Sequence, residues 1–189
     1  MRQSDLDMAE HIFATVEQLM AKEGLHNLSM HKIAKAANIS AGTIYIYFAN
    51  KEQLLRQFVH RVFMRFFHAL EKDHDETLDF FQQYHQMWWN IWHFLQKNPD
   101  TLLNMQQYQS LPGFTQIIEE ERQQGFWRLF CEKGQQAGVL APLPSSLLFA
   151  MGLDSAIRLA MNQVYLNDRY STEMLEAVIS RTWLSITNY

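Results

Sequence analysis

Cysteine, glycine and proline are all scarce in this chain of 189 residues. Cys131 is the single cysteine, so the sequence excludes an internal disulfide or a cysteine-rich zinc site and favours a reducing compartment. The seven glycines and four prolines amount to roughly half the share usual for that pair, which favours helices. Hydrophobic residues make up 48% of the chain, enough to exclude a wholly disordered protein.

Long hydrophobic runs are also missing. No stretch of about 18 apolar residues occurs, so we expect no membrane span. Residues 1–7 are polar and contain no apolar core of the length that a signal peptide needs. Both absences predict a soluble cytoplasmic protein.

Signatures of common enzymes are lacking as well. The sequence has no glycine-rich phosphate loop, no GxSxG elbow and no HExxH motif. A di-iron bundle needs inward-facing Glu-x-x-His pairs, and Glu23 with His26 and Glu71 with His74 do have that spacing. Both pairs lie at the ends of expected helices in polar surroundings. We therefore expect no enzymatic activity, no metal and no cofactor.

Charge is distributed unevenly along the chain, although the net value is only -4. Between His26 and Arg65 six lysines and arginines face one acid, Glu52, so this stretch carries +5 and the remainder -9. A small basic module on a larger acidic body is typical of a nucleic-acid-binding end. The alternative is a chance cluster on a solvated face.

Apolar residues recur at helical spacing along nearly the whole chain, with no alternating strand pattern. The sequence predicts an all-α protein of about nine helices. Gly24 and a site near Gly138 are expected to end helices, and Asn98 with Pro99 to begin one. The expected helices cover residues 7–23, 29–37, 41–47, 50–70, 77–97, 98–109, 114–136, 145–166 and 171–187.

Two of these helices are short and joined by Asn38, Ile39 and Ser40, a spacing that predicts a helix-turn-helix. Asn38 suits a left-handed backbone and Ser40 suits the cap of the next helix. The start of that helix, residues 41–43, is small and polar enough to approach DNA closely. We expect Ile44 and Phe48 to point inward and Tyr45 and Tyr47 to reach phosphates; alternatively, the two tyrosines are half-buried packing residues.

The stretch from Ile12 to Leu55 resembles the N-terminal domain of the TetR family of transcriptional regulators. About ten positions match at the spacing of the family over forty-odd residues, a quarter to a third of the chain. Asn38 replaces the commoner glycine, and Ala41 offers no hydrogen bond. The segments that carry the resemblance contain Gly24, Ile33, Ala34, Ala37, Ile39, Ser40, Gly42, Thr43, Tyr45, Tyr47, Phe48 and 51–55.

The resemblance implies a DNA-binding domain, residues 1–49, followed by a helical effector-binding and dimerisation domain, residues 50–189, with the helix Asn50–Leu70 connecting the two. It implies double-stranded DNA as a partner. A homodimer would place two recognition helices about one helical turn, ~34–36 Å, apart on a palindromic operator. By position in the motif, the implied DNA-binding residues are Ser29, His31, Ser40, Ala41, Gly42, Thr43, Tyr45, Tyr47 and Lys51.

The last two expected helices are candidates for the dimer interface, because their apolar faces could pair into a four-helix bundle between subunits. Close approach of helices there would explain a glycine in a helix interior. The alternative is that these faces pack within one subunit. The candidates are Leu147, Leu148, Met151, Gly152, Ser155, Leu159, Met174, Leu175, Val178, Ile179 and Trp183.

Aromatic residues are concentrated between Phe80 and Phe130, which hold 12 of the 25 in the chain. Such groups line pockets for small molecules, and Glu119–Glu121 could hold an organic cation, so we expect a bulky apolar or cationic effector. The alternatives are a filled core and a solvated acidic face. The expected lining is Tyr84, Met87, Trp88, Trp92, Met105, Tyr108, Phe126, Trp127, Phe130 and Met151.

The sequence thus predicts a ligand-responsive transcriptional regulator, a repressor, that leaves its operator when an effector tilts the long helix beginning at Asn50. The alternative is a helical small-molecule carrier or sensor without specific DNA binding.

Overall fold

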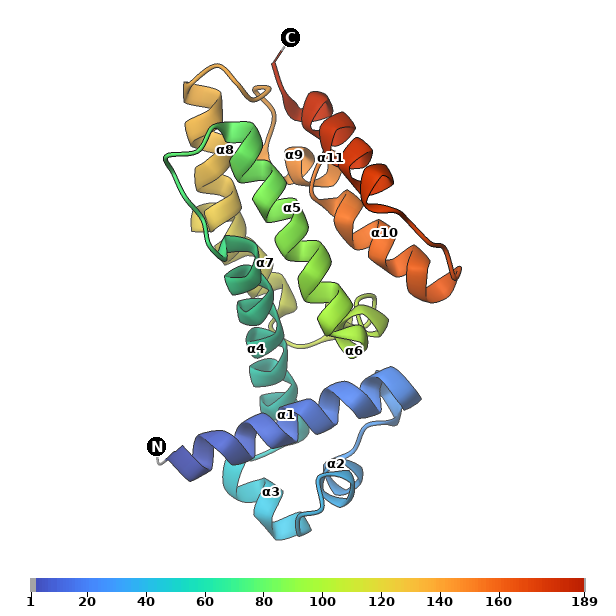
Figure 1. The fold of residues 1–189 in the computed structure, drawn as a ribbon. Coiled ribbons are helices and arrows are strands. Elements are labelled where there is room, and N and C mark those ends of the chain that lie inside the picture. The colour runs from blue at the N-terminus through green and yellow to red at the C-terminus, as the bar shows by residue number, and fades with distance from the viewer. Residues whose placement is uncertain (1–2, 189) are drawn as a thin grey trace. The chain divides into compact units, whose positions relative to one another are not determined.

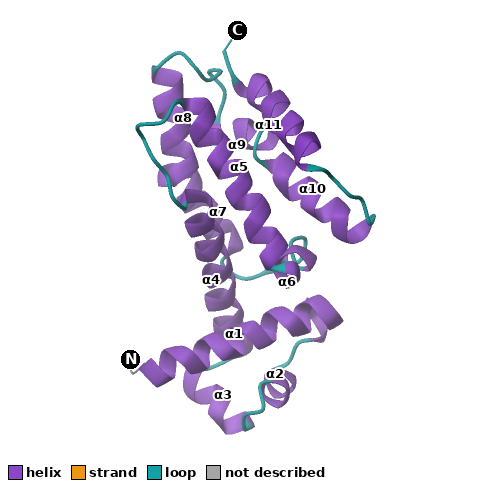
Figure 2. Cartoon of the chain, viewed as in Figure 1, coloured by secondary structure: helices purple, strands orange, loops and turns teal. Residues whose placement is uncertain are grey.

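The computed structural model describes residues 3–188, and helices form most of that part of the chain (Figures 1 and 2). Its one β-type pairing is an isolated bridge between Leu140 and Thr187. The predicted all-α class is confirmed. The α-helices are α1 (Gln3–Glu23), α2 (Met30–Ala36), α3 (Ala41–Tyr47), α4 (Lys51–Glu71), α5 (Phe80–Lys97), α6 (Pro99–Leu103), α7 (Phe114–Gln124), α8 (Phe126–Gln136), α9 (Ser145–Met151), α10 (Asp154–Tyr165) and α11 (Thr172–Ile186), and the 3-10 helices are η1 (Leu25–Asn27) and η2 (Tyr108–Ser110).

Every predicted helical stretch contains a helix, but three are not the single continuous helix that was expected. The stretch 98–109 is the short α6 followed by turns and η2. The stretch 114–136 divides at Gly125, where a Cβ atom would overlap the carboxyl group of Glu121. The stretch 145–166 divides at Gly152 and Leu153.

Gly152 directly follows α9, at a position where a larger residue would crowd its neighbours. A Cβ atom there would lie 3.0 Å from the carbonyl oxygen of Leu148 and 3.1 Å from the hydroxyl of Tyr84. The close approach that the glycine permits is therefore made to α5 of the same chain. This corrects the expectation that Gly152 serves contact with a second subunit.

The chain divides into two compact units. The first contains Met1–Phe63 and Pro99–Thr115, and the second contains Met64–Asn98 and Gln116–Tyr189. Helix α4 therefore gives its first three turns to one unit and its end to the other. The boundary between the compact units within α4 lies after Phe63, not after residue 49. The functional boundary after residue 49 stays a prediction.

The first unit has an aliphatic and aromatic core between α1, α2, α3 and the start of α4. Its central side chains are fully buried: Ile12, Val16, Met20, Ile33, Ile44, Leu54 and Phe58. Gly24 ends α1 with φ +83°, as predicted, because glycine adopts this left-handed conformation at little cost. Phe13 contacts both Phe48 and Phe58, with ring centroids 5.4 and 6.4 Å apart.

Residues 99–111 are held against α1 by buried polar groups. Thr101 and Tyr108 both donate hydrogen bonds to the carboxylate of Glu17, the latter at 3.1 Å. The amide of Asn104 donates to the backbone oxygen of Glu17 at 2.8 Å. The amide of Gln107 donates a hydrogen bond to the backbone oxygen of Met20 near the end of α1 and accepts one from the backbone N–H of Leu25 at 2.7 Å. These bonds tie a segment distant in sequence to the first helix.

The second unit is built around α5, which contacts α10 and α11 (Figure 1). Asp79 and Gln82 form a capping box that fixes where α5 begins. The side chains that α5 buries include Tyr84, Met87 and Trp88. Their burial removes a large apolar area from water, the main favourable term in folding.

No helix in residues 3–188 is both long and apolar enough to cross a membrane. Within the same residues no group of three or more histidine, cysteine, aspartate or glutamate side chains is placed to hold a metal ion.

Candidate nucleic-acid interface

The turn between α2 and α3 has the geometry that its sequence predicts. Asn38 has φ +56°, in the left-handed region. Ser40 caps α3 by accepting a hydrogen bond from the backbone N–H of Thr43 at 3.0 Å, and the two hydroxyls lie 2.7 Å apart. Ser29 caps α2 in the same way through the N–H of Lys32. These caps set the direction of both short helices.

Helix α3 has one face in the core and one in solvent. Ile44 is 0% and Phe48 is 1% exposed, as predicted, and they anchor the helix. Gly42, Tyr45 and Ile46 lie on the outer face, where the exposed fractions of Tyr45 and Ile46 are 47% and 79%. The exposure of Tyr45 argues against a packing role, whereas Tyr47 is half-buried. The outer face of α3 is thus open to a partner.

A hollow of about 660 Å³ lies between α2 and the start of α3. Lys35 and Asn38 border it and are exposed, although sequence reasoning did not include them in the site. Lys35 is one of the six cations counted between His26 and Arg65, so the excess of positive charge in that stretch could have pointed to it. The hollow is lined by His31, Ala34, Lys35, Asn38, Ile39, Ser40 and Ala41.

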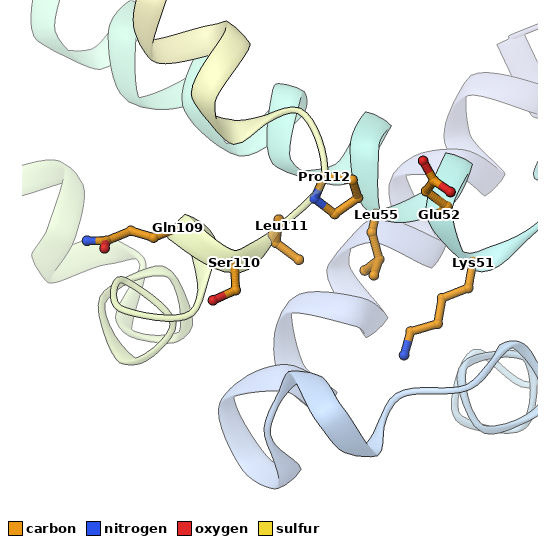
Figure 3. Close-up of a pocket in the computed structure, with 7 residues that line it drawn as sticks. All are labelled: Lys51, Glu52, Leu55, Gln109, Ser110, Leu111 and Pro112. Carbon is orange, nitrogen blue, oxygen red and sulfur yellow. The ribbon is translucent and has the colours of Figure 1, made fainter.

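Lys51 is the first residue of α4, and the sequence also predicts it at the start of this helix. Asn50 caps that helix through the N–H of Gln53 at 2.8 Å. The ammonium of Lys51 donates to the carbonyl oxygen of Leu28 at 2.6 Å, beside Ser29. The structure therefore places Lys51 beside Ser29, and these two residues, with Tyr47, are those that the resemblance assigns to phosphate contacts. A second hollow of about 540 Å³ begins at Lys51 and is lined by Glu52, Leu55 and residues 109–112 (Figure 3).

The positive charge of this region is smaller than the sequence count suggests. Glu10 and Glu23 precede the counted stretch, yet both fold onto it. The hydrogen bond and charge of Lys32 lower the pKa of Glu23 below its ordinary value. The ion pairs are Lys32 with Glu23 at 2.6 Å, Arg56 with Glu52 at 3.3 Å, and Arg61 with Glu10.

Two family models match the chain. The model described as "Bacterial regulatory proteins, tetR family" matches residues 12–58, and "Tetracyclin repressor-like, C-terminal domain" matches residues 79–187. An HTH-type transcriptional regulator from Haemophilus influenzae is 52% identical over 186 residues, which cover 98% of this chain and 99% of the relative. The chain belongs to the TetR family of transcriptional regulators.

Solved structures of the family agree. A TetR-family regulator from Haemophilus influenzae matches with a TM-score of 0.93 and 51% identity, covering 99% of this chain and 100% of that one. A putative TetR-family regulator from Vibrio parahaemolyticus matches with a TM-score of 0.83 and 31% identity, covering 95% and 98%. The chain is therefore a DNA-binding transcriptional regulator, and such regulators are not enzymes. These comparisons give no support to the alternative of a small-molecule carrier.

The residues expected to line an effector pocket fall into separate groups in this TetR-family chain. Met105 and Tyr108 belong to the first unit, where Tyr108 is buried against Phe58, Phe63 and Glu17. The hydrogen bond from Tyr108 to Glu17 ties this segment to α1, and the grouping of these two residues with the remaining candidates stays a prediction. Those lie in the second unit: Tyr84, Met87, Trp88, Trp92, Phe126, Trp127, Phe130 and Met151.

The polar atoms of three buried aromatic residues in the second unit already have partners. The indole N–H of Trp88 donates to the hydroxyl of Ser155 at 2.8 Å, and that of Trp127 to the carbonyl oxygen of Ser145 at 2.8 Å. The hydroxyl of Tyr84 lies 2.8 Å from that of Thr182, and burial raises the pKa of Tyr84. These residues contribute to the core, and a pocket among them stays a prediction.

The acidic run Glu119–Glu121 has two exposed members. Glu119 and Glu120 accept hydrogen bonds from Gln123 and Gln116 on their own helix. Glu121 is half-buried, and burial and then the charge of Glu71 raise its pKa. Of the three carboxylates, Glu121 is the one placed away from bulk solvent.

Four of the predicted dimer-interface residues are buried within the protomer: Leu148, Gly152, Leu175 and Ile179. They pack against their own subunit, as the alternative expected. Ser155, Leu159, Val178 and Trp183 are half-buried, and Met151 is exposed. Sequence reasoning missed exposed apolar residues on the same helices, because periodicity identifies an apolar face without showing what covers it. They are Val164, Tyr165 and Leu184, whereas Leu147 and Met174, which were among the predicted interface residues, are exposed.

Proposed function

We propose that the chain represses transcription as a homodimer. The dimer places two copies of α3 in successive major grooves of a palindromic operator, and binding of a small effector releases the dimer from the DNA. The observation that carries this proposal is the outer face of α3. Gly42 and Tyr45 are exposed there, while Ile44 and Phe48 fix the helix from below. A small residue at 42 lets the backbone approach base edges.

Exposed apolar side chains on α9, α10 and α11 support a dimer. Leu147 and Met151 follow each other by one turn on α9, and Met174 and Leu184 are exposed on α11. Exposed apolar residues on three helices of one unit are a candidate interface, because large apolar patches on a surface mark sites of association. Sedimentation of the purified protein tests this step: a dimer is expected at micromolar concentration, and a monomer that binds the operator singly would contradict it.

Selection of bound sequences from random DNA tests the function as a whole. Because a dimer has two-fold symmetry, the enriched sequence should be an approximate palindrome with half-sites about one helical turn apart. Placing it over a promoter should reduce transcription in vitro on addition of the protein. Enrichment of an asymmetric sequence, or increased transcription, would overturn the homodimeric repressor.

Effector release requires different effector affinities of the free and DNA-bound protein. We propose that an effector in the second unit, bulky and apolar or cationic, tilts α4 and changes the separation of the two α3 helices. Binding and release are then coupled reciprocally, so operator DNA should weaken effector binding by the factor by which the effector weakens DNA binding. Calorimetric titration with and without the operator measures both, and equal effector affinities would rule the mechanism out.

Replacing Lys51 by alanine should weaken binding to all DNA sequences alike. Loss of one phosphate contact per half-site removes about 0.9 from the slope of log affinity against log salt for each contact. Fluorescence anisotropy at several salt concentrations measures that slope. Lys133→Ala is the matched control, because it removes the same charge from a lysine paired with Glu76 in the second unit. An unchanged slope in Lys51→Ala would remove this residue from the interface.

A further inference from the structure

Ile46 occupies an unusual position on the outer face of α3. It is the most exposed large apolar side chain among the described residues, at 79%. Neither packing nor helix propensity accounts for it, because it is almost fully in water and β-branched residues are mediocre helix formers. Isolated exposed apolar residues are common on proteins, so the position of Ile46 on the helix is what distinguishes it.

Helical geometry places Ile46 beside Gly42. Successive residues rotate by about 100°, so Ile46 lies roughly 40° to one side of Gly42 and Tyr45 roughly 60° to the other. Along the axis, Ile46 is about 6 Å beyond Gly42. A duplex that approaches the exposed backbone at Gly42 therefore has the side chain of Tyr45 on one side of the contact and that of Ile46 on the other.

The side chain of Ile46 has no hydrogen-bonding group, which restricts what it can recognise on DNA. In the major groove, the C5-methyl of thymine is the apolar group among the donors and acceptors that distinguish the base pairs. An aliphatic side chain gains from contact with that methyl and loses by covering an amino or carbonyl group. Ala41 and Gly42 offer no side-chain hydrogen bond either, so apolar contact carries weight on this helix.

We propose that Ile46 is a specificity-determining residue, which reads the C5-methyl of one thymine in each half-site of the operator. This inference rests on the proposed DNA-binding role of the α3 outer face. It specifies which base this face recognises: a thymine at the base pair that faces the second turn of α3.

The test uses the operator recovered by selection and removes one methyl group at a time. Each thymine of a half-site is replaced in turn by deoxyuridine, which keeps every hydrogen bond and lacks only the C5-methyl. The symmetric position is changed with it. Full-length protein and its Ile46→Ala variant are titrated against each duplex by anisotropy.

One symmetric pair of substitutions should weaken binding of the unaltered protein about five- to tenfold, the effect expected for losing apolar contact in two half-sites. Ile46→Ala should bind the original operator about as weakly and show no further loss at that pair. Leu78→Ala is the control, because it shortens an exposed apolar residue in the second unit. It should retain the affinity and the full sensitivity of the unaltered protein.

Two results would overturn the inference while leaving the proposed function standing: no deoxyuridine pair weakens the unaltered protein, or Ile46→Ala loses as much as the unaltered protein at every pair. If selection enriches no sequence at all, the proposed function fails and this inference falls with it. Equal thermal unfolding of Ile46→Ala and the unaltered protein confirms that the substitution leaves the fold intact.

Discussion

Replacing Gly42 by leucine should weaken operator binding by about 100-fold or more while leaving the fold intact. Space beside Gly42 is open: the nearest atom to a Cβ built there, outside its own backbone and chain neighbours, is the hydroxyl oxygen of Ser40 at 3.7 Å. The free protein therefore accommodates a side chain at this position. In the complex that side chain would occupy the gap between the backbone of α3 and the base edges.

The expected loss is about 100-fold or more, because both half-sites of a dimer lose their contacts at ~1–3 kcal/mol each. Gly42→Ala should give a smaller loss and raise the free energy of unfolding by up to about 1 kcal/mol, since alanine favours the helix over glycine. Anisotropy and chemical denaturation measure the two effects separately. Full operator affinity in Gly42→Leu would show that α3 does not enter the groove closely.

Replacing Glu17 by alanine should cost about 3–5 kcal/mol of unfolding free energy, one of the largest effects expected for a single change in this chain. Glu17 is 8% exposed, and its carboxylate accepts hydrogen bonds from Thr101 and Tyr108. Without it two buried donors are left unpaired, at about 1–3 kcal/mol each, and a cavity opens beside them. Domains of this size have only about 5–15 kcal/mol to lose.

Glu52→Ala is the matched control for Glu17→Ala. Glu52 also pairs with a donor, Arg56, but its side chain is 71% exposed, and such surface pairs contribute at most about 1 kcal/mol. Urea denaturation of both variants checks the contrast. Equal stabilities would mean that residues 99–111 are not held to α1 by these buried bonds.

The local features of the candidate interface were predictable because they depend on neighbouring residues. Asn38 adopts its left-handed conformation because its short polar side chain tolerates it, and Ser40 caps the helix that it immediately precedes. The burial of Ile44 and Phe48 follows from helical periodicity alone. Each of these outcomes needs only a few consecutive residues.

Features that depend on distant parts of the chain were not predictable. The pairing of Arg61 with Glu10 joins residues 51 positions apart, so a count of charges along the sequence overestimates the free positive charge. Tyr108 belongs with Glu17 because of a contact across 91 positions, whereas composition grouped it with the aromatic residues of α5. Gly125 and Gly152 lie at the two helix breaks, in close contacts that periodicity does not register.

Photo-crosslinking from α3 tests most directly the central claim that its exposed face contacts operator bases. Tyr45 is replaced by p-benzoylphenylalanine, which keeps an aromatic ring at a position that is 47% exposed. Leu129, 48% exposed on α8 in the second unit, receives the same replacement as a control. Irradiation of the bound complexes should join residue 45, and not residue 129, to a base within each half-site. A complex that binds the operator tightly, yet crosslinks from residue 129 and never from residue 45, would contradict the account.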